Sequence, residues 1–407
     1  MRVKLDYTKL SVACILLSLP LSWLVLQRDM GTKTVPTVRI ASFNAAMNRA
    51  EPTAMLAELR AGSDQARKIA EVVQRADIDV LLLCELDRDE GEEAARVFAK
   101  DYLAVSQNGQ KPIDFAHVFF AASNTGEPSS RDLDRDGKSD GPGDAYGYGK
   151  FRGQYAMALL SRHPIRSDAA RTFRMLPWSA MPNALRPAGY WSDEDWNALR
   201  LSSKSHWDVP VRIAGRDVHM LCSHPTPPAF DGAEDRNGCR NHDEIRFWVD
   251  YLTPERSQWI VDDQGARGGL AADAHFVVLG DLNCDPVDGE SKRDALLQLL
   301  AHPRVFDPSP KSAGGKQASV DQWALNAEHK GDAACDTADF EDEAPKADAP
   351  GTGGPGNLRV DYALPSRSLY FADSAVYWPT QREPGGAIVD ASDHRLVFVD
   401  VGFAPAK

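Results

Sequence analysis

The stretch FVVLGDLNCDP, residues 276–286, combines the pattern of a buried strand with a polar ending. An apolar run stops at Gly280 and is followed by Asp281, Asn283 and Asp285. Asp and Asn close turns well, so an ordinary turn is one interpretation of this ending. The other is that the strand carries polar groups to a functional site at the rim of a sheet. The other strand ends of the chain decide between the two.

Composition sets the first limits on fold and function. The chain has 407 residues, 43% of them hydrophobic, which is enough to bury a large core. Its formal net charge is -13 at pH 7. Bulk electrostatic binding of nucleic acid needs clustered Lys and Arg, so this charge balance argues against it. A phosphate-bearing substrate would have to be met locally, by a metal ion or a few cationic side chains.

Residues 1–30 have the pattern of a targeting segment. Three basic residues precede an apolar run over residues 10–26, which Pro20 interrupts. This pattern predicts that residues 1–30 are a signal peptide or an N-terminal membrane anchor, followed by a tether over residues 31–37. We therefore expect an exported protein that is periplasmic, extracellular or anchored in the membrane and facing outward.

Cysteine spacing leaves the disulfide question open. Of six cysteines, five lie outside the N-terminal segment, and Cys222 and Cys239 flank a short loop-rich stretch. An exported compartment permits disulfides, so these two could be bridged. Two free thiols are the alternative, because spacing alone does not establish a bridge.

Strand-like and helix-like patterns alternate along the chain. Short runs rich in Val, Ile and Leu predict strands within residues 38–44, 78–86, 155–161, 209–215, 217–224, 275–283, 358–366 and 394–402. Apolar residues at helical spacing predict helices within residues 64–77 and 240–252. Strands interleaved with helices indicate a layered α/β or α+β architecture.

Two segments depart from this pattern. Residues 123–150 are rich in Gly, Asp and Ser, and residues 331–357 are acidic and rich in Gly and Pro. Both are expected to be loop insertions. Because they interrupt the series of strands, we expect one domain over residues 38–405 that contains both insertions.

Acid, amide and imidazole side chains stand at the ends of six predicted strands. They are Asn44, Glu85, His224, Asp281, Asn283, Asp361, Asp393 and His394. A turn explains one such ending, but six favour a site built where strands converge. Phosphoester hydrolysis needs these side-chain types, because it requires charge neutralisation at phosphorus, an activated water and a proton donor.

The ordered motifs SFN, LLLCELD, SHPTPP, GDLNCDP, RVDYALPS and SDHRLVFVDV resemble those of the endonuclease/exonuclease/phosphatase superfamily, the deoxyribonuclease-like fold. The resemblance covers residues 38–403, nearly the whole body of the chain. It implies an α+β fold, a four-layer α/β/β/α sandwich of two packed mixed β-sheets flanked by helices. It also implies a metal-dependent hydrolase that acts on phosphoester bonds.

The resemblance implies a metal site at one side of the constellation. Asn44 and Glu85 match the first asparagine and the metal-binding glutamate of the family, and Asp393 matches a carboxylate on the metal side. Such oxygen ligands suit Mg²⁺, Mn²⁺ or Ca²⁺. Some nucleases of the family have an aspartate where this chain has Ala46. We therefore expect one firmly held ion.

The resemblance also implies the catalytic roles. Asp281 and Asn283 match the pair that orients or deprotonates the attacking water and holds a phosphoryl oxygen. His224 falls where one branch of the family keeps a histidine beside the phosphate. Asp361 matches the aspartate that supports the final histidine, His394, which is a proton donor or stabilises the pentacovalent species.

An acidic stretch in the first insertion has calcium-loop spacing. Asp132, Asp134 and Asp136 alternate as in loops that wrap a hard cation, and Asp140 could complete the shell. The twelfth position is Gly143 rather than Glu, so the stretch is no EF-hand. The prediction is a structural Ca²⁺ site, and the alternative is a solvated acidic loop.

Four side chains are candidates for substrate contact. Lys204 and His206 come just before a predicted strand, and Arg236 and Arg240 come at the start of a predicted helix, so both segments could bring cationic or imidazole groups to the site. The segment after Arg240 has two interpretations: Asn241 either reaches the site or caps a helix.

The sequence therefore predicts an exported, divalent-metal-dependent phosphoesterase that hydrolyses phosphodiester bonds in the manner of a nuclease. The alternative is a lipid or small-molecule phosphodiesterase or phosphatase, either sphingomyelinase-like or phosphate-scavenging. A less favoured alternative is a non-catalytic calcium-dependent binding module. The expected partners are the phosphoester substrate and a membrane that holds residues 10–26, with no obligate protein partner.

Overall fold

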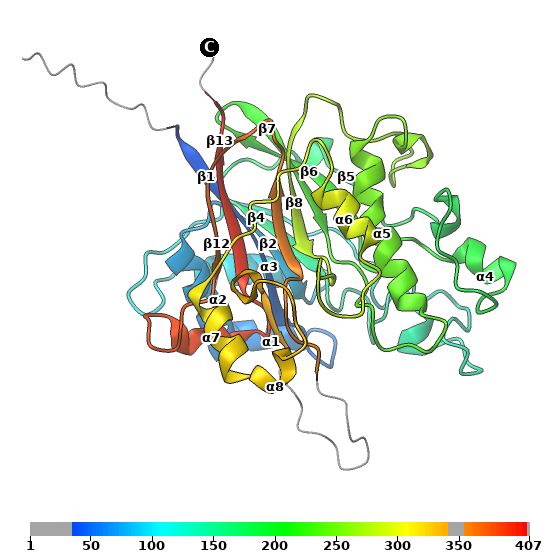
Figure 1. Ribbon diagram of the computed structural model, residues 1–407, viewed down its shortest axis with the longest axis horizontal. Helices are drawn as coiled ribbons and strands as arrows, with labels where there is room; N and C mark the ends of the chain where they lie inside the picture. The colour runs from blue at the N-terminus through cyan, green and yellow to red at the C-terminus, as the bar shows by residue number, and fades with distance from the viewer. Residues whose placement is uncertain (1–34, 341–353, 405–407) are drawn as a thin grey trace, which may run out of the picture. The chain divides into compact units, whose positions relative to one another are not determined.

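The computed structural model describes residues 35–340 and 354–404 (Figure 1). The predicted signal peptide or anchor, most of the tether over residues 31–37 and the middle of the second insertion lie outside these residues. In the two described ranges, no helix combines the length and the apolar character needed to cross a membrane.

The first sheet has six strands in the order β12, β13, β1, β2, β4, β3. Their bounds are β1 Thr37–Met47, β2 Val80–Leu86, β3 His117–Phe119, β4 Met157–Ser161, β12 Tyr370–Tyr377 and β13 Leu396–Gly402. β1 and β2 are parallel, and the other pairs are antiparallel. The two parallel strands therefore end at the same edge of the sheet.

The second sheet has five strands in the order β11, β8, β7, β6, β5. Their bounds are β5 Arg171–Thr172, β6 His206–Ile213, β7 Arg216–Ser223, β8 His275–Asp281 and β11 Asp361–Pro365. Here β7 and β8 are the parallel pair. A separate two-stranded sheet pairs β9 Ala338–Phe340 with β10 Gly356–Leu358.

The two main sheets share one apolar core. Alternate residues of each strand point to the same face, so every second side chain of β6 and β7 faces the first sheet. The buried cluster between the sheets includes Val80, Leu82 and Cys84 of β2 together with Val209, Val211, Val218, Met220 and Cys222 of β6 and β7. The sheets are therefore packed face to face.

Helices cover the outer face of each sheet. α1 Ala54–Ala61, α2 Asp64–Ala76 and α3 Glu93–Val97 share a buried cluster with the first sheet. α5 Arg236–Leu252 and α6 Asp294–Leu300 share one with the second sheet, on whose outer side Figure 1 draws them. The remaining helices are α4 Asp193–Ala198, α7 Ala313–Asp321 and α8 Trp323–Asn326. The predicted four-layer sandwich is confirmed.

All eight runs predicted as strands contain one, and both predicted helices form. The strands that the sequence patterns missed, β3, β5, β9, β10 and β12, are very short or lie at a sheet edge. β12 is exposed over much of its length, so it lacks the apolar run that identifies a buried strand.

Of the two alternatives for Cys222 and Cys239, the structure has two free thiols. All five cysteines in the described part of the chain are free thiols. Cys222 faces the core between the sheets, whereas Cys239 lies on α5 and packs in the cluster on the outer side of the second sheet. The sheet itself separates the two sulfur atoms.

A buried acid near the second insertion makes stability depend on pH. Burial raises the pKa of Asp336 from its ordinary value of 3.8 to about 8, and the charges of Asp285 and Asp288 add to the effect. The folded protein thus binds this proton more tightly than the unfolded chain. The resulting stabilisation is complete below pH 3.8 and is lost as the pH rises through about 8.

We expect Asp336→Asn to remove this loss, because the amide carries no charge at any pH. The free energy of unfolding of the variant should exceed that of the parent by about 5 kcal/mol at pH 9 and should match it at pH 3. Urea titrations at both pH values measure the difference. Glu290→Gln, at an exposed position, is the control and should change neither value. A gain of equal size at both pH values would contradict the electrostatic cause.

Candidate active site

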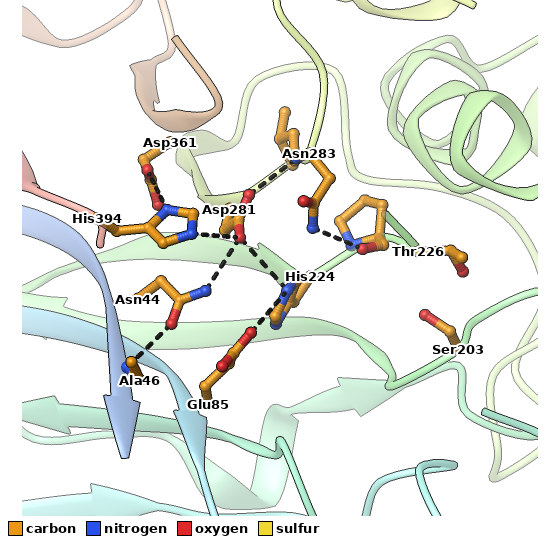
Figure 2. A network of polar contacts seen from close by, with 12 residues as sticks. Asn44, Ala46, Glu85, Ser203, His224, Thr226, Asp281, Asn283, Asp361 and His394 are labelled. Atoms are coloured by element: carbon orange, nitrogen blue, oxygen red, sulfur yellow. Dashed lines mark hydrogen bonds and ion pairs between the residues drawn. The ribbon is translucent and has the colours of Figure 1, made fainter. Parts of the chain in front are cut away.

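The predicted site residues converge at one end of the two sheets (Figure 2). Asn44 and Glu85 come from the parallel strands β1 and β2 of the first sheet. In the second sheet His224 directly follows β7 and Asp281 ends β8, the strand parallel to it. Parallel strands bring their carboxyl ends to one edge, so each sheet contributes a pair of residues to the same mouth.

Asp281 is the centre of the constellation. Its Oδ2 lies 3.1 Å from Asn44 Nδ2, 3.4 Å from His224 Nε2 and 3.6 Å from His394 Nε2. Its Oδ1 accepts a hydrogen bond from the backbone N–H of Asn283 at 2.9 Å. Burial raises the pKa of Asp281 to about 6, although the cationic His394 counteracts this rise. A carboxylate of this kind accepts a proton near neutral pH.

His394 is held as a cation by two carboxylates. Its Nδ1 lies 2.8 Å from Asp361 Oδ2, and its Nε2 faces Asp281. Burial lowers the pKa of His394, but the charges of Asp361 and Asp281 outweigh it and raise the pKa to about 10. With a proton on both nitrogens the ring has no lone pair for a metal ion. Although ligand atoms of these three residues lie within 4.8 Å of one another, they fit a proton-donating group better than a metal centre.

His224 has the opposite character. It is buried, and burial lowers its pKa well below 6.5, with Lys204 and His394 adding to the effect. The ring is therefore neutral at physiological pH. Its Nε2 lies 4.0 Å from Glu85 Oε1 as well as next to Asp281, so it stands between the two carboxylates (Figure 2).

Glu85 and Asn44 form the oxygen-rich side of the site. Glu85 has a φ of 60°, a left-handed conformation that is strained for a residue of this kind and is often found at functional sites. Its Oε2 accepts a hydrogen bond from Asn48 Nδ2 at 2.8 Å, and its side chain is 24% exposed. The Asn44 amide oxygen accepts from the Ala46 backbone N–H at 3.1 Å, where the register of β1 against β2 shifts. A carboxylate and an amide oxygen are the donors that a hard divalent cation takes, so the residues fit such an ion.

Asp393 is the other carboxylate predicted at the metal. It is exposed, and its carboxylate has a single hydrogen bond among the described residues, from Ser392 Oγ at 3.5 Å. Its neighbours Ser392 and His394 are both buried, and they are bonded to the Asn44 carbonyl and to Asp361. The negative charge of Asp393 raises the pKa of both His394 and Asp361. The shared metal site of Asp393 and Glu85 stays a prediction.

Three of the four predicted substrate contacts belong to the scaffold. His206 is buried with both ring nitrogens bonded, to Ser202 Oγ and to the backbone carbonyl of Glu244, and burial lowers its pKa to about 4. It has no nitrogen left for a ligand. The guanidinium of Arg240 donates to three backbone carbonyl groups, and Arg236 forms an ion pair with a neighbouring glutamate.

Lys204 is the exception. It is 7% exposed and has no hydrogen bond to its ammonium group and no ion pair within the described part of the chain. Burial lowers its pKa, while the charges of Glu244, Glu85 and Asp281 raise it. A buried ammonium without a direct partner is costly, so this group is available for an anionic ligand at the mouth of the site.

Two positioning residues on α5 were underestimated from the sequence. α5 begins at Arg236, so Asn241 lies inside the helix and the cap interpretation is wrong. Its Nδ2 donates to the carbonyls of Thr226 at 2.8 Å and Leu282 at 2.9 Å. Glu244 accepts from the Ser203 and Thr226 backbone N–H groups, both at 2.6 Å. These contacts hold the segment before β6 and the loops that follow β7 and β8. The helical spacing of the apolar residues around Asn241 and Glu244 is the sequence signal that places both residues inside a helix.

The predicted calcium loop is partly assembled. Ligand atoms of Asp132, Asp134 and Asp136 lie within 4.8 Å of one another, but Asp140 is not part of this group. The nearby Asp144 is buried and accepts from backbone N–H groups of the loop, which accounts for its place without an ion. Exposed acidic groups commonly occur without a metal. The calcium site therefore stays a prediction.

The chain is similar to known proteins over most of its length. A model described as the Endonuclease/Exonuclease/phosphatase family matches residues 41–394. Among solved structures, an endonuclease/exonuclease/phosphatase from Beutenbergia cavernae is 18% identical with a TM-score of 0.49, and the match covers 90% of this chain and 72% of that one. Sphingomyelinase C from Streptomyces griseocarneus is 15% identical with a TM-score of 0.41, covering 90% and 99%. The human Nocturnin catalytic domain is 14% identical with a TM-score of 0.43, covering 91% and 94%. No individual curated protein sequence matches the chain.

Proposed function

Because the chain belongs to the endonuclease/exonuclease/phosphatase family, whose members hydrolyse phosphoester bonds, we propose that it is a divalent-metal-dependent phosphodiesterase of the nuclease type. One observation carries this proposal. A single buried carboxylate oxygen, Asp281 Oδ2, lies within 3.6 Å of the side-chain nitrogens of Asn44, His224 and His394. This places a proton acceptor beside donors that can hold a phosphoryl group.

Asp281 and Asn283 align the attacking water in this proposal. Asp281 accepts the proton, since its raised pKa of about 6 makes it a better base than an ordinary aspartate and leaves it ionised at neutral pH. Asn283 is fixed by a hydrogen bond from its Nδ2 to the Pro225 carbonyl at 3.1 Å. Its amide can therefore hold the water or a phosphoryl oxygen without adding charge.

His394, His224 and Lys204 stabilise the charge that develops on the phosphoryl oxygens. His394 donates from Nε2 while Asp361 holds Nδ1 and keeps the ring in orientation. Neutral His224 donates a hydrogen bond without competing for the proton on His394. Lys204 supplies a positive charge that forms no ion pair with a carboxylate of residues 35–340 or 354–404. Each such donor is typically worth a factor of about 10² in rate.

Glu85 and the amide oxygen of Asn44 would hold the metal ion. When bound there, a hard divalent cation supplies Lewis-acid stabilisation of the phosphoryl oxygens. Burial raises the pKa of Glu85, and a cation nearby would offset that penalty by favouring the ionised carboxylate.

A substrate panel tests the proposal. The full chain is incubated with plasmid DNA, RNA, sphingomyelin vesicles and nitrophenyl phosphodiesters, each with Mg²⁺, Mn²⁺ or Ca²⁺. We expect cleavage of a nucleic acid by at least one metal form and a loss of at least tenfold with EDTA, because the ion is part of the charge balance. Hydrolysis of none of these substrates would refute the proposal, and hydrolysis that EDTA leaves unchanged would refute its metal dependence.

A lipid phosphodiesterase is the second candidate, supported by an exposed aromatic residue. Phe230 is 88% exposed and lies in the loop between His224 and α5. A large apolar side chain on a loop next to the site suits contact with a lipid surface. In the panel, faster hydrolysis of sphingomyelin than of any nucleic acid would favour this candidate.

Export is part of the proposal. It is supported by the sequence of residues 1–30, where basic residues precede the apolar run over residues 10–26 as in a signal peptide or membrane anchor. Either form would place the enzyme outside the cytoplasm.

A further inference from the structure

Two arginines meet at one amide oxygen beside the site. The Nη1 atoms of Arg174 and Arg200 lie 3.4 Å and 2.6 Å from Asn124 Oδ1. Asn124 is fully buried, and its Nδ2 donates to the carbonyls of Arg174 at 2.7 Å and Ser202 at 2.8 Å. The amide is thus fixed at both ends, and it sets the positions of both guanidinium groups.

No carboxylate neutralises this pair. Within the described ranges neither arginine forms an ion pair. The two acids whose charges act on Arg200, Glu127 and Asp263, have other partners. Glu127 pairs with Arg152 at 3.2 Å, and Asp263 accepts from the backbone N–H of Arg174 at 3.1 Å. Burial lowers the pKa of Arg200, and the charge of Arg174 lowers it further. Two like charges so close repel each other, and an anion between them would relieve the repulsion.

The pair is preorganised for a ligand. The guanidinium of Arg200 lies over the ring of Tyr146, 3.7 Å from its centroid, and the Arg200 carbonyl accepts from Arg240 at 2.9 Å. The first contact fixes one face of the Arg200 guanidinium, and the second fixes the backbone of Arg200. Tyr148, two residues along the same loop, is exposed. An arginine stacked on one aromatic ring, with an exposed ring in the same loop, is a combination that suits single-stranded nucleic acid.

The pair is linked to the catalytic centre by a short segment. The Asn124 backbone N–H donates to the carbonyl of Lys204 at 2.8 Å, and Lys204 is only four positions after Arg200 in the chain. Four residues span at most about 14 Å. Phosphates recur about every 3.4 Å along the axis of one nucleic-acid strand. A phosphate near the hydrolysed one can therefore reach the two arginines.

We propose that Arg174 and Arg200 form a phosphate subsite that binds a second phosphodiester group of an oligonucleotide whose neighbouring phosphodiester is hydrolysed at Asp281. This inference rests on the proposed function and names its substrate class. A compound with a single phosphate would fill the catalytic centre and leave the subsite empty, so the subsite distinguishes an oligonucleotide from a minimal ester.

The test uses Arg174→Gln/Arg200→Gln, which removes both charges and keeps polar side chains next to Asn124. Binding of a fluorescein-labelled single-stranded 12-mer to the full chain is followed by anisotropy in EDTA, which prevents turnover. We expect the Kd to rise about tenfold, because charge-assisted hydrogen bonds are lost. The slope of log K against log salt concentration should fall in magnitude by about 0.7, the value for one phosphate of a single strand.

Kinetics provide the second readout. We expect the ratio of kcat/KM for the 12-mer to kcat/KM for a nitrophenyl ester of thymidine phosphate, which has one phosphate, to fall about tenfold in the variant. Arg174→Gln alone keeps the stacking of Arg200 on Tyr146, and so it tests the idea even if the double variant unfolds. Arg212→Gln, at the other end of β6, is the control and should match the parent.

The outcomes separate the subsite from the proposed function. Unchanged oligonucleotide affinity and salt slope in folded variants would overturn the subsite, as would an equal loss on both substrates. If the parent hydrolyses no phosphoester but the variants still lose oligonucleotide binding, the proposed function fails and the subsite stands. A loss on vesicles of anionic lipid instead of the 12-mer would also overturn the assignment to oligonucleotides.

Discussion

Asp281→Asn and His394→Gln are each expected to lower the turnover of the best phosphodiester substrate by about 10³-fold or more. The asparagine keeps the size of Asp281 and its contact with Asn44, but it cannot accept a proton from water. The glutamine can still bond to Asp361, but it has no positive charge to offer a phosphoryl oxygen. Initial rates at saturating substrate measure both effects.

Both variants should remain folded, because each replacement fills the same space and keeps a polar contact. We expect melting temperatures within about 5 °C of the parent. His163→Gln, a partly buried histidine after β4, is the matched control and should retain parental turnover. The double variant should be little worse than the poorer single one, since residues that act as a unit are not additive. Parental turnover in both single variants would show that the roles are assigned wrongly.

The sequence patterns predicted most of this site because its residues stand where apolar runs stop. Apolar runs that predict buried strands end at Asn44, Glu85, His224 and Asp281. The parallel pairing of β1 with β2 and of β7 with β8 then brings their carboxyl ends together. The apolar runs in the sequence predict where the buried strands end, and the polar residues at those ends are therefore candidates for a functional site.

Other parts of the site depend on long-range packing that no local pattern contains. The motif of Asp393 predicts a metal ligand but not the exposure of this residue, which depends on how the residues around it pack. The sequence allows Asn241 either to cap a helix or to reach the site, and only the start of the helix at Arg236 excludes the cap. Arg174 and Arg200 meet only through Asn124, an amide 50 and 76 residues away in the chain. Local sequence patterns do not predict a contact between residues so far apart in the chain.

Glu244→Ala is expected to lower the free energy of unfolding by about 4 kcal/mol. Glu244 is buried and accepts from the backbone N–H groups of Ser203 and Thr226 and from Ser203 Oγ at 2.9 Å. Its loss leaves two backbone donors buried without an acceptor, each costing about 1–3 kcal/mol, together with a cavity. Urea denaturation of the parent and the variant measures the change.

Turnover should fall in the same variant by about a hundredfold, because Ser203 adjoins Lys204 and Thr226 follows His224 by two residues. A displacement of about 1 Å in a group that contacts the substrate is enough for a loss of this size. Glu255→Ala, an exposed position just beyond α5, controls for loss of a carboxylate and should change neither property.

Asn241 provides a sharper test of this positioning role, since Glu244 holds the N–H of Thr226 while Asn241 holds its carbonyl at 2.8 Å. A double-mutant cycle with Asn241→Ala should therefore give a coupling of at least about 0.5 kcal/mol in stability. Glu244→Gln should recover little of the loss, because its amide nitrogen would face a backbone N–H where a carboxylate oxygen now accepts. A glutamine variant with parental stability and turnover would mean that size alone matters at this position, and the two loops would then need another anchor.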